Sequence, residues 1–198
     1  MSLCADSRCK PLKNKQIFTK MSYAREYDWI PISNSIQEIH FGKTSSVNMW
    51  IEFETSKYEI WRGSFECGEN GKRVIIEIGN SEYIIVANGK GYIINSDLKK
   101  LNTEIELEEI IDIYKLNANE YLIANYEGIS IINTKGELKT ITNMLILDEF
   151  SVENEDEEYI TAKFVSSIYQ WKNMYFKFDK NQRTFEIKKR LTKWYKKA

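Results

Sequence analysis

The residues of this chain that could carry out chemistry are few. His40 is the only histidine, and Cys4, Cys9 and Cys67 are the only cysteines among 198 residues. A zinc set drawn from them would contain one Cys-x4-Cys pair, whereas structural zinc sites usually present two such pairs. We therefore expect no metal and no cofactor, and we interpret His40, which lies in an apolar stretch, as an ordinary strand residue.

Motifs for nucleophilic or phosphate chemistry are incomplete. The run Gly-Glu-Asn-Gly-Lys-Arg at 68–73 is two residues shorter than a phosphate loop, and Arg73 stands where a magnesium-binding hydroxyl belongs. The run also precedes a predicted strand, so the helix N-terminus that receives phosphate is missing. A hairpin turn is the better interpretation. The chain contains no Gly-x-Ser-x-Gly elbow and no Gly-x-Gly-x-x-Gly fingerprint.

Carboxylates are the abundant reactive groups, and they cluster in two runs. Residues 148–158 carry seven acidic side chains and no basic one, and residues 104–112 carry five. Acid–base catalysis needs two groups held at a defined separation in different environments, so density alone predicts no activity. We interpret 148–158 as a solvated acidic loop or a partner surface, with Glu155, Asp156 and Glu157 as candidate binding residues.

Basic residues gather toward both ends of the chain. Residues 177–198 hold nine lysines and arginines against two acids, and residues 8–20 hold five basic residues. Aromatic residues interleave with the C-terminal cations, a pattern that would suit single-stranded nucleic acid. However, the alternation Phe176-Lys177-Phe178 is that of a strand with aromatics on its buried face, and the pI is near 6.0. Nucleic acid is therefore not the expected partner.

The elements that must position these groups follow a repeat. The dipeptide Glu-Tyr recurs at 82–83, 120–121 and 158–159, a constant spacing of 38 residues. Each copy follows turn-forming residues and opens a short apolar run, and six of fourteen positions are identical between 82–95 and 120–133. Such a period is typical of stacked supersecondary units. We expect Tyr83, Tyr121 and Tyr159 to be packing residues.

Short β-branched runs separated by Asn, Gly, Ser and Asp predict antiparallel strands. The expected strands are 36–41, 50–54, 58–61, 74–78, 83–87, 92–94, 110–116, 121–124, 129–132, 138–141, 174–178 and 184–187. Apolar and charged residues alternate through 50–61, as on a sheet with one wet face. Helical spacing of Leu107, Ile110, Ile111 and Tyr114 leaves a helix there as an alternative.

These elements predict an all-β fold. Residues 28–190 divide into about four antiparallel meander units of roughly 40 residues, arranged as a small β-propeller, with a β-sandwich or a curved β-barrel as alternatives. Residues 1–27 are expected to be a basic N-terminal extension, and 191–198 a basic tail. One glycine-bearing turn per unit should lie on a shared face, which makes Asn88, Lys90, Tyr126 and Glu127 candidate binding residues.

The stretch 121–139 reads Tyr-Leu-Ile-Ala-Asn-Tyr-Glu-Gly-Ile-Ser-Ile-Ile-Asn-Thr-Lys-Gly-Glu-Leu-Lys. Its succession of strand, turn, strand and turn resembles the core of bacterial propeller-type repeats, including the WG repeats, and the resemblance extends over 74–142. It implies a propeller-like architecture and a binding or scaffolding role, and it implies no catalytic residue.

Three function classes follow from these patterns. The first is a non-enzymatic module that binds a protein partner. The second is an inhibitor or immunity-type protein whose acidic surface masks a basic active site, and the third is a carboxylate-based enzyme acting on carbohydrate or nucleotide. No apolar run has the length of a membrane span, and no secretory h-region is present. Sparse, odd-numbered cysteines suit a reducing compartment, so we expect a cytoplasmic protein without a membrane partner.

Overall fold

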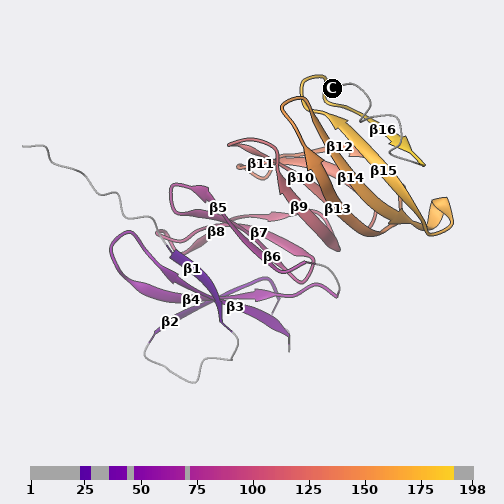
Figure 1. Cartoon of the computed structure of the whole chain (residues 1–198). Coiled ribbons are helices and arrows are strands. Elements are labelled where there is room, and N and C mark those ends of the chain that lie inside the picture. Colours follow the sequence, from indigo (N-terminus) through magenta and orange to yellow (C-terminus); the bar gives the residue numbers. More distant parts are fainter. Residues whose placement is uncertain (1–22, 28–35, 44–46, 70–71, 190–198) are drawn as a thin grey trace, which may run out of the picture.

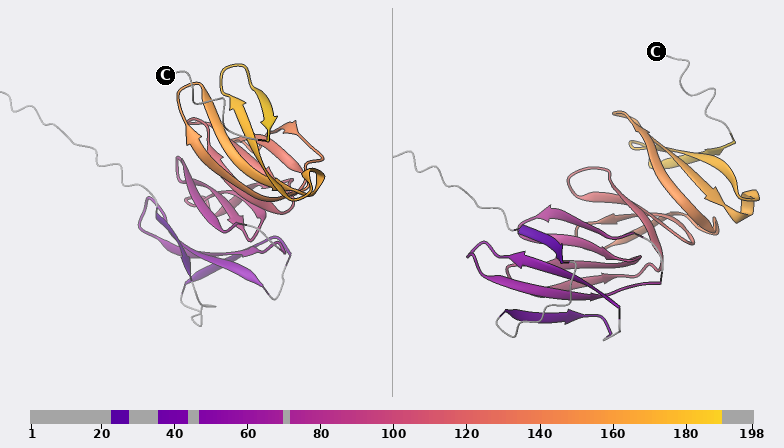
Figure 2. Two further views of the ribbon diagram at one scale, coloured as in Figure 1. Left: turned by 45° about the vertical axis from the view of Figure 1, so that its right-hand side comes forward. Right: turned by 60° about the horizontal axis from the view of Figure 1, so that its bottom comes forward.

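The computed structural model describes residues 23–27, 36–43, 47–69 and 72–189, which fold into four β-sheets of four strands each. The mainly antiparallel all-β fold built from four units is thereby confirmed. The sheets follow one another in chain order, from the first at the lower left of Figure 1 to the fourth at the upper right. Both further views keep the first and fourth sheets at opposite ends of the row (Figure 2).

The second, third and fourth sheets are simple meanders, in which each strand pairs with the next along the chain. The second sheet contains β5 (Val74–Gly79), β6 (Glu82–Ala87), β7 (Lys90–Asn95) and β8 (Lys100–Ile105). The third contains β9 (Ile110–Lys115), β10 (Glu120–Asn125), β11 (Gly128–Asn133) and β12 (Leu138–Thr142). The fourth contains β13 (Leu147–Glu155), β14 (Tyr159–Ser166), β15 (Lys172–Asp179) and β16 (Thr184–Lys188), with a short 3-10 helix, η1 (Ser167–Tyr169), between β14 and β15.

The first sheet departs from the expected meander. Its strands are β1 (Tyr23–Tyr27), β2 (Gln37–Phe41), β3 (Asn48–Glu54) and β4 (Ile60–Glu66), in the order β1-β3-β4-β2. β2 pairs parallel to β4, and β1 pairs antiparallel to β3. The predicted extension 1–27 therefore ends too late, because its last five residues form a strand. The adjacent charged residues Arg25 and Glu26 interrupt the alternation of apolar and polar residues from which a strand is predicted.

Three hydrophobic clusters join neighbouring sheets face to face. The first lies between the first and second sheets, where the rings of Phe53 and Trp61 stack with centroids 4.4 Å apart and Tyr83 meets Phe53 edge-on. The second cluster lies between the second and third sheets, and the third between the third and fourth. No cluster of described residues joins the first sheet to the fourth, so the sheets form an open row.

Burial along the strands reflects position in this row. In the two middle sheets the central strands are buried on both faces, and every residue from Tyr83 to Ala87 is inaccessible to solvent or nearly so. On β3 and β15 of the end sheets burial alternates: Met49, Ile51 and Phe53 are buried on β3, as are Met174, Phe176 and Phe178 on β15. The wet face predicted for 50–61 is therefore present. Open stacks need such polar outer faces to stay soluble.

The Glu-Tyr repeat marks the second strand of three sheets. Glu82 and Glu120 begin β6 and β10, and Tyr159 begins β14. Tyr83 and Tyr121 are buried between sheets, as expected for packing residues. Tyr159 is only partly buried and belongs to no core cluster of described residues, and the Lys177 ammonium lies 3.5 Å from its ring centroid, so the packing prediction is wrong for the third copy. The reason is that its sheet is the last in the row.

Two further expectations are settled in this region. Residues 110–115 are strand β9, so the helical alternative is excluded. The run 148–158 is not a loop, because most of it is β13, a strand of nine residues.

Within the described residues, no helix has the length and apolar character needed to cross a membrane.

Candidate binding cleft at the linker end

The chain passes from sheet to sheet along one side of the row, where β4, β8 and β12 end. The turn between the second and third strands of each later sheet lies on the same side, beside the linkers, whose described residues are 67–69, 72–73, 106–109 and 143–146; we call this side the linker end. In the second sheet, the amide of Asn88 donates to the backbone carbonyl oxygens of Gly68 (2.9 Å) and Glu69 (3.2 Å). In the third, Asn125 donates to the Glu108 carbonyl at 3.3 Å. In the fourth, the Ser166 hydroxyl donates to the Leu145 carbonyl.

The turns of the second and third sheets also bind the linker that leaves the same sheet. The amide of Ile110 donates to the carbonyl of Gly89, and the amide of Leu147 donates to the carbonyl of Tyr126, both at 2.8 Å. Gly68 has room only for a hydrogen, because a Cβ there would lie 2.6 Å from the Asn88 carbonyl oxygen. The turns and linkers therefore form one hydrogen-bonded surface across the row.

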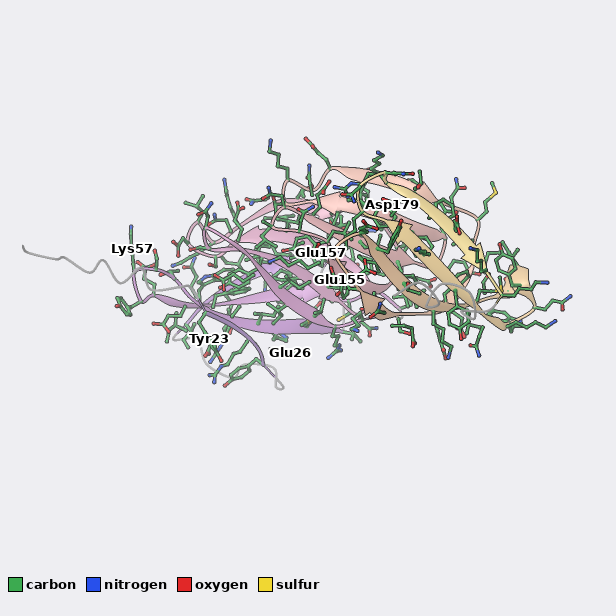
Figure 3. All side chains as sticks on the ribbon, turned by 45° about the horizontal axis from the view of Figure 1, so that its top comes forward. Tyr23, Glu26, Lys57, Glu155, Glu157 and Asp179 are labelled. Atoms are coloured by element: carbon green, nitrogen blue, oxygen red, sulfur yellow. The ribbon has the colours of Figure 1, made fainter. Side chains whose placement is uncertain are left out.

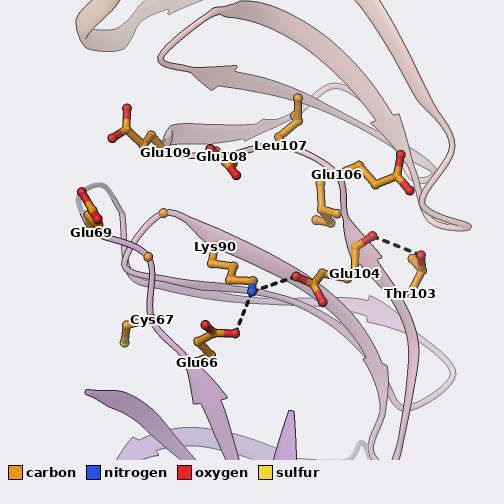
Figure 4. Close-up of a pocket in the computed structure, with 13 residues that line it drawn as sticks. Glu66, Cys67, Glu69, Lys90, Thr103, Glu104, Glu106, Leu107, Glu108 and Glu109 are labelled. Carbon is orange, nitrogen blue, oxygen red and sulfur yellow. Dashed lines mark hydrogen bonds and ion pairs between the residues drawn. The ribbon is translucent and has the colours of Figure 1, made fainter. Parts of the chain in front are cut away.

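A cleft of about 860 Å³ opens in this surface between the first linker and the second. It is bordered by the end of β4, the β6–β7 turn, the end of β8 and the linker to the third sheet (Figure 4). Six carboxylates and one amine line it: Glu66, Glu69, Glu104, Glu106, Glu108, Glu109 and Lys90. The cleft is therefore strongly acidic.

The positive charge of Lys90 is already paired with carboxylates within the cleft. Its ammonium lies 2.7 Å from a carboxylate oxygen of Glu66 and 2.9 Å from one of Glu104. Partial burial acts to lower the pKa of Lys90, but the hydrogen bonds to both carboxylates outweigh it and raise that pKa above its ordinary value. Hydrogen bonds from Lys90 and from the backbone amide of Lys43 lower the pKa of Glu66. Lys90 thus stays cationic and Glu66 stays anionic at neutral pH.

The other carboxylates of the cleft are available to a ligand. Within the described part of the chain, no ion pair reaches Glu69, Glu106, Glu108 or Glu109. Glu69, Glu106 and Glu108 are exposed. No group of three or more metal-ligating side chains with a metal-site arrangement is found among the described residues. The arrangement is suited to attracting cationic groups over a broad area.

The predicted site residues separate into two places. Asn88, Lys90, Tyr126 and Glu127 all lie at the linker end, where Asn88 and Lys90 are engaged internally and Tyr126 and Glu127 are exposed. Glu155, Asp156 and Glu157 lie at the opposite end of the fourth sheet, where β13 turns into β14. Figure 3 shows Glu155, Glu157 and Asp179 there, apart from Tyr23, Glu26 and Lys57 of the first sheet.

Two of the acidic residues at that opposite end have structural roles. Glu155 pairs with Lys180 and accepts a hydrogen bond from the Tyr114 hydroxyl on the third sheet; these contacts lower its pKa and connect the two sheets. Asp156 accepts from the backbone amides of Glu158 (2.9 Å) and Tyr159 (2.7 Å), which closes the turn. Only Glu157 is left exposed without a contact of this kind among the described residues.

The sequence interpretation missed the cleft carboxylates. Their one local signal was the run 104–112, with five acids and no base between two repeat units. His40 and Cys67 form no catalytic group with one another: His40 is an exposed β2 residue packed edge-on against Trp50, and burial raises the pKa of the Cys67 thiol.

The fold and the cleft define the class of the molecule, an all-β repeat protein with an acidic cleft where its sheets are linked. No protein-family model matches the sequence, and no curated protein is significantly similar to it.

Proposed function

We propose that the protein is a non-enzymatic interaction module whose acidic cleft binds a basic segment of a partner protein. The observation that carries this proposal is the cleft itself, whose lining contains six carboxylates and one internally paired lysine. Complementary charge accelerates association and excludes acidic partners. A propeller-like row of sheets and the resemblance to WG-like repeats fit a binding or scaffolding role, and the sparse cysteines fit a reducing cytoplasm.

The test is retention of partners on the immobilised protein. The double variant Glu106→Lys and Glu108→Lys reverses two exposed charges in the cleft, and Glu77→Lys with Glu157→Lys is the matched control elsewhere. We expect the wild type and the control to retain the same protein, released between roughly 50 and 200 mM salt, and the cleft variant to lose it. Equal retention by all three proteins, or no specific partner for any, would reject the proposal.

An inhibitor or immunity-type role is the narrower form of this proposal, in which the bound segment belongs to an enzyme's basic active site. The cleft is a better surface for it than 148–158, because Glu155 and Asp156 are engaged internally. In that case purified partner enzyme loses activity on addition of the wild type and keeps it on addition of the cleft variant.

A carbohydrate-active enzyme is the second candidate, since several carboxylates line one concave site. Acid catalysis needs one carboxyl with a raised pKa beside an ionised one. Among the cleft carboxylates the shift that is resolved, that of Glu66, is a lowering. Hydrolysis of a glycoside by the wild type, abolished in Glu104→Gln, would favour this candidate over the binding module.

A further inference from the structure

Large apolar side chains are exposed at the linker end of the third and fourth sheets. The exposed fractions are 76% for Met144, 60% for Trp171, 50% for Ile168 and 47% for Tyr126. We call these four residues the apolar patch. Contiguous exposed apolar surface of this kind marks interaction sites in soluble proteins.

Backbone hydrogen bonds place the members of the patch side by side. The linker 143–146 is bonded to the β10–β11 turn, because the Leu145 amide donates to the Glu127 carbonyl at 2.9 Å. On its other side, the Ser167 amide donates to the Ile146 carbonyl at 3.3 Å, and the Trp171 amide donates to the Ser166 carbonyl at 2.9 Å. Tyr126, Met144 and the η1 turn with Ile168 and Trp171 are therefore neighbours in that order.

Two of these side chains contribute little to the stability of the fold. Met144 and Trp171 have positive φ angles of 59° and 57°, a backbone region that glycine and asparagine occupy at lower cost. Their side chains are more exposed than buried, so little hydrophobic burial offsets that cost. The exposure of Met144 and Trp171 is therefore not explained by packing within the fold.

The charges around the patch are asymmetric. On the side of the cleft lie Glu127, Glu108 and Glu109, and the Tyr126 amide donates to the Glu109 carbonyl at 3.2 Å, which makes the patch continuous with the cleft wall. On the far side, Lys172 and Lys189 line a groove of about 390 Å³ beside Ile168. A bound segment would therefore be apolar over the patch and basic toward the cleft, and a reversed charge order would be repelled at both ends.

The spacing sets the length of such a segment. Packed sheets lie about 10 Å apart, so the η1 turn of the fourth sheet is on the order of 20 Å from the linker between the second and third sheets. An extended chain rises about 3.3 Å per residue and covers that distance in roughly six residues.

We infer that the apolar patch and the acidic cleft are one docking surface for an extended segment of a partner protein. The segment carries apolar anchors for Trp171, Ile168 and Met144, and lysine or arginine about six residues away for Glu108 and Glu106. The inference rests on the proposed function, because the cleft half of the surface is the site proposed there. Buried aromatic anchors supply most of the affinity of such interfaces, and the rim charges set orientation and rate.

Site-specific photo-crosslinking in the native cell tests the inference. The photoreactive amino acid p-benzoylphenylalanine is placed at Trp171, at Glu108 or at Tyr58. Tyr58 is a matched control: it is aromatic, 67% exposed and at φ 66°, but belongs to the β3–β4 turn at the opposite end. The crosslinked peptides are identified by mass spectrometry.

The expected result is one partner protein captured from both Trp171 and Glu108, through sites about six residues apart, apolar and basic respectively. Capture from Glu108 alone overturns the inference and leaves the proposed function standing. Capture at Trp171 of a second copy of this chain, or of lipid, also overturns it. No capture from either position rejects the proposed function together with the inference.

A substitution gives an independent readout of the anchor. Trp171→Asn suits the backbone at this position and removes the indole, and we expect it to lower capture from Glu108 by at least about tenfold. Tyr58→Asn makes the same kind of change at the opposite end and should leave capture unchanged. Equal capture with Trp171→Asn and with wild type would overturn the role assigned to the patch.

Discussion

Replacing each of two buried tyrosines by phenylalanine should change the free energy of unfolding in opposite directions. Tyr121 and Tyr92 are both fully buried, in the second and first hydrophobic clusters respectively. The hydroxyl of Tyr121 has no hydrogen-bond partner among the described residues, whereas the hydroxyl of Tyr92 donates to the Glu66 carbonyl at 2.8 Å. Replacing each by phenylalanine removes one oxygen atom and preserves the ring packing.

The magnitudes follow from these partners. A buried hydroxyl without a hydrogen bond costs about 1–3 kcal/mol, so Tyr121→Phe should raise the free energy of unfolding by about 1 kcal/mol. Tyr92→Phe removes the partly buried hydrogen bond to the Glu66 carbonyl, so it should lower that free energy by about 1–2 kcal/mol. The melting temperatures should move apart by roughly 4–12 °C for a chain of this size.

Urea unfolding followed by far-UV circular dichroism and by tryptophan fluorescence measures both variants. The fully buried Trp61 reports tertiary packing, and coincidence of the two signals checks that the row of sheets unfolds as one unit. Unchanged m-values with shifted midpoints identify a change in stability alone. A Tyr121→Phe variant destabilised by about 1 kcal/mol or more would refute the reasoning, because it would show that an internal water satisfies the hydroxyl.

The remaining predictions concern the linkers, the turns and pH. Asn88→Gly keeps the positive φ but loses the bonds to the linker, and should cost about 1 kcal/mol by urea unfolding; Asn88→Ala should cost about 1 kcal/mol more. Gly128→Ala should cost about 2 kcal/mol or more, because a Cβ would overlap the Thr142 carbonyl; an unchanged midpoint would contradict that packing. Glu66 and Glu155 have folded pKa values below the ordinary 4.5, so the stability they contribute is present above pH 4.5 and lost as the pH falls through the folded values. Thermal melts in this range should show a shallower loss for Glu155→Gln than for wild type.

Much of the fold could be predicted from local pattern. The turn residues before Glu82 and Glu120, and the β-branched runs after them, specify strands and hairpins through interactions a few residues apart. Alternation in β3 and β15 correctly indicated sheets with one wet face. β13 was missed because a run with many acidic residues is typical of a solvated loop. Leu147 and Phe150 are nevertheless buried on this strand.

The candidate site was much less predictable. The sequence indicated that the turns at Asn88 and Tyr126 share a binding face, and the structure does place both turns at the linker end. Glu155 was selected for its acidic neighbours, yet its partners Lys180 and Tyr114 come from β15–β16 and β9, far away in the sequence. No local rule reveals that a carboxylate is engaged by a residue on another sheet.

The sequence by itself therefore determined the repeat, most of the strands and the polar outer faces of the end sheets, because each depends on side-chain period and turn chemistry within one unit. Only the tertiary structure decided that the row stays open and that Glu66, Glu104 and Glu108 surround one cleft. These carboxylates come from a strand end, a second strand end and a linker. Their convergence depends on how the sheets stack, which is set by packing between units.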